Sequence, residues 1–221
     1  GQRAARARGS ARPGAWQRAA RRVAARGPGA WQHGAMRQNR PAPAAKVPLV
    51  VIGVVRTDHT VPETTPIQAA LNRAGHAAIE IAEPYRAGLA GLDGFGYAWL
   101  LTWLHRPAGA EEAGPRRGLP PLRQVPFLLR RQQREMGIFA TRGPRRVNPI
   151  GLSLIQLLEV TPDTVLFAGV GVVDGSPVID LKPYVTRFDR PPGDPPCGWF
   201  DEVALDEGAT PAGLARPEPP A

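Results

Sequence analysis

The chain has 221 residues, 26 prolines, 25 glycines and a formal net charge of +9. Its single cysteine, Cys197, excludes a disulfide framework and a cysteine zinc cluster within one chain. The sequence has no apolar run long enough to span a bilayer and no apolar stretch of a secretory signal, so we expect a cytoplasmic protein without a membrane segment or a bound metal.

The first 46 residues carry the excess of positive charge. They contain ten arginines and Lys46 but no acidic residue, whereas the rest of the chain has 17 basic and 19 acidic residues. Arginine, alanine, glycine and proline dominate this stretch, and such a composition buries too little apolar surface to offset chain entropy. We expect residues 1–46 to be a basic disordered tail or a non-native extension. The alternatives are an arm that binds RNA phosphates and an organellar transit peptide.

Three strands are predicted in the next part of the chain. Residues 47–55 are a β-branched run typical of a buried strand, residues 77–82 alternate between apolar and polar, and residues 97–104 have strand composition. Proline, glycine and arginine over residues 107–126 predict a long loop. A short strand is expected at residues 137–140.

The following segments predict further strands joined by tight turns. Residues 152–160 fit either a helix or a strand, and the nearby short segments 164–168 and 177–181 favour a strand. Short strands without long amphipathic helices between them indicate a mainly β fold, an antiparallel β-barrel or sandwich. We expect this domain to span residues 47–189, followed by a flexible Pro-rich C-terminal tail over residues 190–221.

The most informative segment, residues 137–153, reads GIFATRGPRRVNPIGLS. Pro144 and Pro149 stiffen a loop with three arginines, which such a loop holds in place with little further entropy loss on binding. These arginines are Arg142, Arg145 and Arg146. The alternative is a rigid turn whose arginines are solvated.

The second informative segment, residues 174–184, reads DGSPVIDLKPY. Asp174 and Gly175 alone fit an ordinary hairpin turn, and Asp180 and Lys182 alone fit a pair on one face of a strand. The segment is informative only when it is considered together with the arginine-containing loop at residues 137–153.

Together the two segments resemble the TsaA/TrmO-like family, whose patterns are ATRSPxRPNPIGLS and DGTPVLDIKPY. Further similarities occur in the same order at residues 52–57, 65–68, 91–95 and 103–105. The resemblance spans about residues 51–189, and several separated motifs in the right order make it specific.

The resemblance implies an antiparallel β-barrel that pairs into a homodimer and binds S-adenosylmethionine. The characterised activity of the family is N6-methylation of N6-threonylcarbamoyladenosine beside the tRNA anticodon, so tRNA is the implied partner. Carried over to matching positions, the implied cofactor contacts are Pro66, Ile67, Gln68, His105, Arg106, Arg142, Leu152, Asp174, Gly175, Ser176 and Pro177.

The chain departs from the family pattern in loops near this implied site. Gly143 stands in place of serine, Val147 in place of proline, and Ser176 in place of threonine, while Gly96 and Tyr97 replace Ser-His. Such changes can alter substrate choice while the cofactor pocket is kept. A small-molecule methyltransferase and an S-adenosylmethionine-binding protein without turnover therefore remain alternatives, as does a generic basic RNA-binding module.

Two residues are candidates for a general base. Methyl transfer to N6 requires alignment of the nitrogen with the methyl group, and removal of the N6 proton would help. His105 and Tyr184 are the side chains we name for this role. For His105, a packed or surface histidine without a proton role is the alternative.

Arginines predict the RNA-binding surface. Residues 116–146 contain nine arginines against a single acid, Glu135. We name Arg130, Arg131, Arg145 and Arg146 as candidate RNA contacts. The alternative is a solvated basic face.

Overall fold

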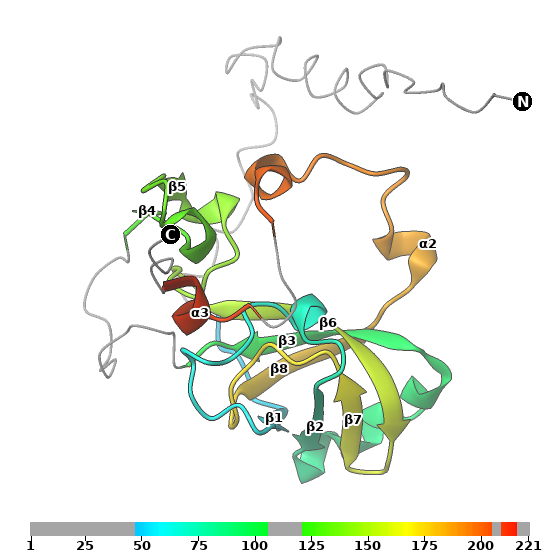
Figure 1. Cartoon of the computed structure of the whole chain (residues 1–221). Helices are drawn as coiled ribbons and strands as arrows, with labels where there is room; N and C mark the ends of the chain where they lie inside the picture. Colours follow the sequence, from blue (N-terminus) through cyan, green and yellow to red (C-terminus); the bar gives the residue numbers. More distant parts are fainter. Residues whose placement is uncertain (1–46, 106–120, 205–208, 216–221) are drawn as a thin grey trace, which may run out of the picture. The chain divides into compact units, whose positions relative to one another are not determined.

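A computed structural model of the chain describes residues 47–105, 121–204 and 209–215 (Figure 1). The predicted N-terminal tail and most of the expected loop at 107–126 lie outside the described residues, and so does Arg106. Within the described ranges, no helix combines the length and apolar character that crossing a membrane requires.

Six antiparallel strands form a closed barrel in the order β1-β2-β7-β6-β3-β8 (Figure 1). The strands are β1 (Gly53–Arg56), β2 (His76–Ile81), β3 (Tyr97–Trp103), β6 (Ile150–Val160), β7 (Thr164–Ala168) and β8 (Pro177–Pro183). Closure pairs both edges of every strand and leaves no free sheet edge. The predicted antiparallel β-barrel is confirmed.

The interior of the barrel is filled by alternate side chains of each strand. Along β3, Ala98, Leu100 and Thr102 are buried, whereas the residues between them are partly exposed. Other strands contribute fully buried side chains to the same cluster, namely Val55, Ile79, Ile155 and Phe167. The barrel is thus a packed core, and binding has to take place on the loops at its ends or on its outer surface.

Short elements connect and cover the strands. They are the two-stranded pair β4 (Arg123–Gln124) and β5 (Met136–Gly137), the 3-10 helices η3 (Ala69–Leu71), η4 (Glu83–Leu89), η5 (Leu92–Gly94), η6 (Phe127–Leu129), η7 (Ile138–Ala140) and η8 (Gly198–Glu202), and the α-helices α2 (Thr186–Asp189) and α3 (Pro211–Ala215).

The strands predicted at 77–82, 97–104, 152–160, 164–168 and 177–181 are confirmed as β2, β3, β6, β7 and β8. The turn at Asp174 and Gly175 is present, but it does not close a hairpin. The strands on its two sides, β7 and β8, are not neighbours in the barrel.

Two predicted strands are wrong in part. The strand expected over 47–55 begins only at Gly53, because β2 ends at Ile81 opposite that residue, and the valines and Leu49 before it are exposed. The strand expected at 137–140 is mostly the 3-10 helix η7, since only Met136–Gly137 finds a partner strand in β4.

The register of three neighbouring strands brings distant loops together. Thr102 of β3 lies opposite Val178 of β8 on one side and opposite Gly151 of β6 on the other. Three segments therefore leave the barrel side by side, namely 174–177 before β8, 104–105 after β3, and 141–149 before β6. They include most of the residues predicted to contact the cofactor.

Gly171 allows the loop after β7 to pack closely on the loop before η3. A Cβ at this position would lie 2.6 Å from the backbone nitrogen of Ala69 and 2.7 Å from the carbonyl carbon of Gln68. Both are backbone atoms, so no side-chain rotation can relieve the clash. The chain around Gln68 is thereby held against the loop after β7.

We predict that Gly171→Ala lowers the free energy of unfolding by about 1–3 kcal/mol, because the added methyl group forces the two backbones apart. Urea unfolding of the purified protein measures this change. Gly94→Ala is the matched control, since a Cβ at Gly94 meets no atom within 4 Å. Equal unfolding midpoints for the two variants would contradict the close packing described at Gly171.

Candidate functional site

Arg142 joins two of the other predicted cofactor contacts. Its Nε donates a hydrogen bond to Oε1 of Gln68 at 3.1 Å, and its Nη2 donates one to the carbonyl oxygen of Leu152 at 3.2 Å. The guanidinium is exposed, and its Nη1 has no hydrogen-bond partner among the described residues. Three predicted contacts, of which Gln68 lies 74 residues before Arg142, therefore form one polar cluster with donors still available.

Several backbone contacts position Gln68. The preceding residue, Ile67, donates its N–H to the carbonyl oxygen of Ala209 at 2.9 Å, and the carbonyl of Gln68 accepts from Leu71 at 3.0 Å as η3 begins. Pro66 is buried. Gln68 thus starts a short helix whose entry and first turn are both fixed.

The loop that carries Arg142 is held from inside by Thr141 and Arg146. The Oγ1 of Thr141 donates to the carbonyl of Ile138 at 3.0 Å and accepts from Nε2 of Gln124 at 3.0 Å. Nη1 of Arg146 donates to the carbonyls of Ile138 at 3.0 Å and Thr141 at 2.8 Å. Arg146, named from the sequence as an RNA contact, is partly buried and uses this nitrogen to hold the loop.

Residues 174–177 form a turn whose polar groups mostly bond to the turn and to the chain after β1. Asp174 accepts from the N–H of Thr57 at 3.1 Å through Oδ1 and donates its own N–H to the carbonyl of His59 at 2.7 Å. Gly175 has a φ of 72°, which favours glycine. Ser176 is buried, its Oγ donates to the carbonyl of Val173 at 2.7 Å, and Pro177 begins β8.

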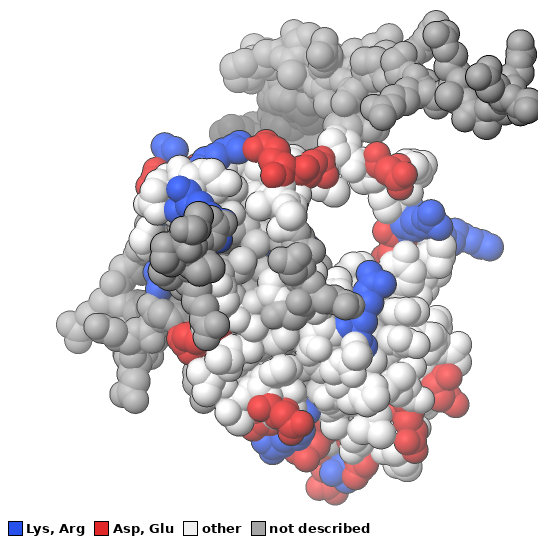
Figure 2. All heavy atoms as spheres, in the orientation of Figure 1, with Lys and Arg blue, Asp and Glu red and all other residues white. Residues whose placement is uncertain are grey.

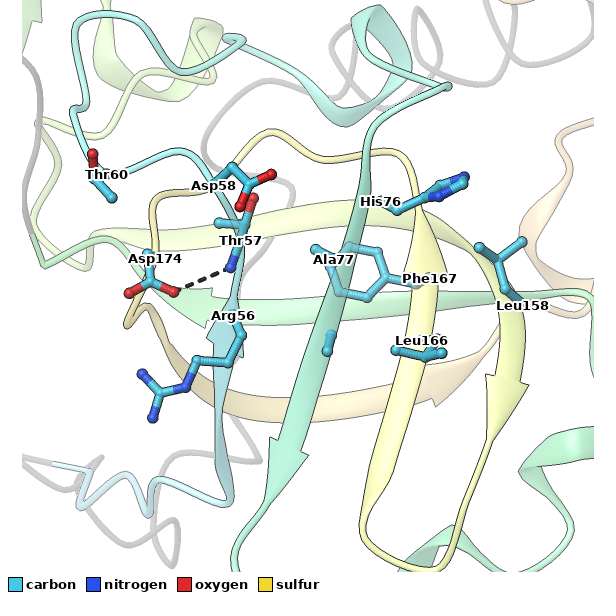
Figure 3. Close-up of a pocket in the computed structure, with 11 residues that line it drawn as sticks. Arg56, Thr57, Asp58, Thr60, His76, Ala77, Leu158, Leu166, Phe167 and Asp174 are labelled. Atoms are coloured by element: carbon cyan, nitrogen blue, oxygen red, sulfur yellow. Dashed lines mark hydrogen bonds between the residues drawn. The ribbon is translucent and has the colours of Figure 1, made fainter.

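An open cavity of about 670 Å³ lies beside this turn (Figure 3). Figure 3 shows Asp174, Thr57 and Arg56 on one side of the cavity and His76, Phe167 and Leu158 on the other. Asp174 is the one predicted cofactor contact in its lining, and Gln68, Arg142 and Leu152 do not line it. The polar cluster, in which Arg142 donates to Gln68 and to the Leu152 carbonyl, is therefore separate from this largely open cavity.

The two candidate bases lie at opposite ends of β3. The N–H of Tyr184 donates to the carbonyl of Tyr97 at 2.9 Å, and its ring contacts Trp99 edge-on at a centroid distance of 6.0 Å. His105 follows the other end of the strand, next to Leu104, whose N–H donates to the carbonyl of Pro149 at 2.7 Å. Seven residues of strand extend about 20 Å. One acceptor atom cannot meet both side chains, and only His105 is near the Arg142 segment.

Asp180 and Lys182 form the simple same-face pair that the sequence allows. Nζ of Lys182 lies 2.8 Å from Oδ2 of Asp180. This hydrogen bond and the charge of Asp180 raise the pKa of the Lys182 ammonium. The pair therefore accounts for these two residues without any ligand.

The candidate RNA contacts differ in their exposure. Arg130, Arg131 and Arg145 are exposed, and the guanidinium of Arg130 lies 4.1 Å from the centre of the Phe127 ring. Nearby, Arg134 pairs with Glu202 and Arg123 with Glu135. On the face shown in Figure 2, basic and acidic side chains lie in small separate groups without one broad basic area.

Sequence reasoning missed the residues that hold the site. Gln124 and Trp199 bond to Thr141 and Ala140 at the start of the Arg142 loop but have no motif of their own. Trp199 lies in the segment predicted to be a flexible tail. Its one signal in the sequence was an aromatic pair, Trp199 and Phe200, in an otherwise Pro-rich stretch. Within the described ranges, no three His, Cys, Asp or Glu side chains gather as metal ligands.

Comparisons with known proteins agree on one family. A family model described as the tRNA-methyltransferase O N-terminal domain matches residues 54–190. The chain is 36% identical over 138 residues to a probable S-adenosyl-L-methionine-binding protein of Methanothermobacter thermautotrophicus, covering 62% of this chain and 90% of that protein. It is also 36% identical over 140 residues to the tRNA (adenine(37)-N6)-methyltransferase of Escherichia coli, covering 61% and 56% of the two chains.

A solved structure shares the fold. The crystal structure of TrmO from Pseudomonas aeruginosa superposes with a TM-score of 0.53 at 26% sequence identity, covering 69% of this chain and 62% of that chain. This chain thus spans less than two thirds of the Pseudomonas chain and little more than half of the Escherichia coli enzyme.

Proposed function

We propose that this chain, which belongs to the tRNA-methyltransferase O N-terminal domain family, is an S-adenosylmethionine-dependent methyltransferase. Its proposed acceptor is the N6 nitrogen of N6-threonylcarbamoyladenosine next to the tRNA anticodon. The observation that carries the proposal is the cluster of Gln68, Arg142 and the Leu152 carbonyl beside the segment that bears His105.

The cluster has the chemistry that S-adenosylmethionine requires. The methionine part of this cofactor ends in a carboxylate and an ammonium group. Arg142 offers exposed N–H donors in a fixed orientation, which suit a carboxylate. Gln68 and the backbone carbonyl of Leu152 provide oxygen acceptors beside it. We assign these three residues to cofactor binding, together with Pro66 and Ile67, which lead into Gln68.

The turn at residues 174–177 has a supporting role in this proposal. Its side-chain groups make contacts within the turn and with Thr57. A ligand would therefore contact the backbone atoms of the turn and not a charged side chain. The contacts of Asp174 tie the start of β8 to residues 57–59, which follow β1, while β8 itself pairs with β3. The turn thereby keeps the neighbouring segments in register.

Bound S-adenosylmethionine supplies a methyl carbon made electrophilic by the adjacent sulfonium. The protein binds and orients both reactants so that they meet in line. His105, at the end of β3, is the residue we propose to accept the N6 proton of the acceptor at a ring nitrogen. Tyr184, the other candidate base, lies at the opposite end of the strand from His105 and is not part of this proposal.

Three exposed arginines form the proposed tRNA contact. Arg145 lies in the loop of Arg142, Arg130 and Arg131 follow η6, and exposed guanidinium groups bind phosphates without reading sequence. Arg146 is left out, since it holds the loop through two backbone carbonyls. We also propose that the enzyme acts in the cytoplasm, where its acceptor is found, and that residues 47–189 are the catalytic domain.

A homodimer is the proposed assembly. Alternate residues of β6 place Ile150, Leu152 and Leu154 on the outer face of the barrel, with exposed fractions of 37%, 45% and 37%. A row of exposed aliphatic side chains on a barrel strand is typical of an interaction surface. Because Leu152 belongs to the cofactor cluster, pairing through this row would shield the site from water.

We predict that incubation with S-adenosylmethionine and tRNA rich in N6-threonylcarbamoyladenosine yields its N6-methyl derivative. Mass spectrometry of the digested nucleosides measures the product. Arg142→Gln should raise the Kd for the cofactor about tenfold or more, because charge-assisted hydrogen bonds are lost. Cofactor binding without a methylated nucleoside would instead indicate a binding protein or an enzyme with another acceptor.

We predict that the double variant Arg130→Ala and Arg131→Ala weakens tRNA binding and lowers the salt slope of log K by about 1–2, because each phosphate contact contributes about 0.7–0.9. Binding assays at several salt concentrations measure the slope. Arg187→Ala with Arg190→Ala is the matched control, as both arginines are exposed at α2. An identical slope for the two double variants would argue against the proposed surface.

We predict that light scattering gives the mass of two 23.7 kDa chains for the unaltered protein and of one chain for Leu154→Glu. A charge placed in the apolar row cannot be buried without a large cost. Gln156→Glu adds a charge on the same face of β6 at an exposed polar position and should leave the dimer intact. A monomeric unaltered protein would rule out the proposed assembly.

A further inference from the structure

The C-terminal residues 198–204 and 209–215 contact both loops that carry the polar cluster. These residues follow the last barrel strand and lie beyond residues 54–190, which the family model matches. The barrel closes without them. Their contacts therefore need an explanation other than completion of the sheet.

Trp199 holds the loop of Arg142. Its indole Nε1 donates a hydrogen bond of 2.7 Å to the carbonyl oxygen of Ala140, two residues before Arg142. The side chain is only 6% exposed, and its ring stacks on Phe200 at a centroid distance of 3.8 Å. A buried indole with a satisfied N–H fixes both the position and the orientation of the backbone that it bonds.

The end of the described chain holds the loop of Gln68. The carbonyl of Ala209 accepts the N–H of Ile67 at 2.9 Å, and Ala212 donates its N–H to the carbonyl of Glu63 at 2.8 Å. Helix α3 also packs against η6, which precedes the Arg142 loop in the chain. The residue immediately before Gln68 is thus bonded to the same C-terminal segment that bonds Ala140.

The two partners in the Gln68–Arg142 hydrogen bond are therefore held by one further segment. A pair of side chains on separate loops keeps its geometry only if both loops keep theirs. On the surface, an ion pair of 2.6 Å between Arg134 and Glu202 adds another link to the same segment.

We propose that the C-terminal segment positions Gln68 and Arg142 for cofactor binding, with Trp199 as the principal positioning residue. The proposal rests on the proposed function, because only then is the pair a cofactor contact. Trp199 itself touches neither cofactor nor acceptor. It acts through the backbone at Ala140, so its loss should affect affinity for the cofactor more than the rate of the chemical step.

The test is Trp199→Phe, which keeps an aromatic ring next to Phe200 and removes the N–H donor. We expect the Kd for S-adenosylmethionine, measured by calorimetry on the full chain, to rise about threefold to tenfold, as one hydrogen bond is lost. The kcat at saturating cofactor should stay within about twofold. Trp99→Phe makes the same chemical change at the far end of β3 and should leave the Kd unaltered.

A second background separates positioning from general loss of stability. When Arg142→Gln has already removed the guanidinium, Trp199→Phe should cause little further change in the Kd, because coupled residues are not additive. An equal rise in both backgrounds would overturn the proposal. Glu202→Gln, which alters only the surface link, serves if Trp199→Phe does not fold, with an expected rise of about twofold.

The outcomes distinguish this proposal from the function on which it rests. Unaltered affinity in the Trp199 and Glu202 variants, with normal binding by the original chain, would overturn the positioning role alone. An original chain that binds no S-adenosylmethionine would overturn the proposed function and the positioning role with it.

Discussion

The arrangement of the site depends on the hydrogen bonds of one guanidinium group. Arg142 connects the loop before η3 with the first residues of β6, and among the described residues these two segments share no other hydrogen bond. Because arginine presents its donors in a rigid planar fork, the bonds to Gln68 and Leu152 also fix the direction of the remaining N–H groups. The geometry available to a ligand is set by these contacts within the protein.

The barrel makes this arrangement possible through strand register. Thr102, Gly151 and Val178 lie side by side across three strands, so segments separated by dozens of residues in the sequence emerge together. The packed interior leaves no room for a ligand, and the exposed loops at the strand ends carry the polar groups. Rigid strands thus position the loops that carry the polar side chains, as in many barrels whose binding residues lie on connecting loops.

The sequence predicted the barrel well and the supporting contacts poorly. Alternation and tight turns identify five strands, and the motif around Arg142 picks out the loop whose hydrogen bonds reach Gln68 and Leu152. The strand at 47–55 was overextended, because composition does not reveal where the partner β2 ends. Arg146 is predicted as an RNA contact, and the sequence does not show that its guanidinium bonds backbone carbonyls. Trp199 was assigned to a flexible tail, since its partner Ala140 is 59 residues away and no local pattern encodes such a contact.

The late position of Trp199 and Ala209 in the chain has a consequence for biosynthesis. All six barrel strands precede these residues, so a chain emerging from the ribosome can complete its sheet before the carbonyl of Ala140 and the N–H of Ile67 meet their partners. The loops that carry Gln68 and Arg142 are then the last parts of a nascent chain to reach their final positions. Premature termination after β8 would leave a closed barrel in which these two loops lack their C-terminal hydrogen-bond partners.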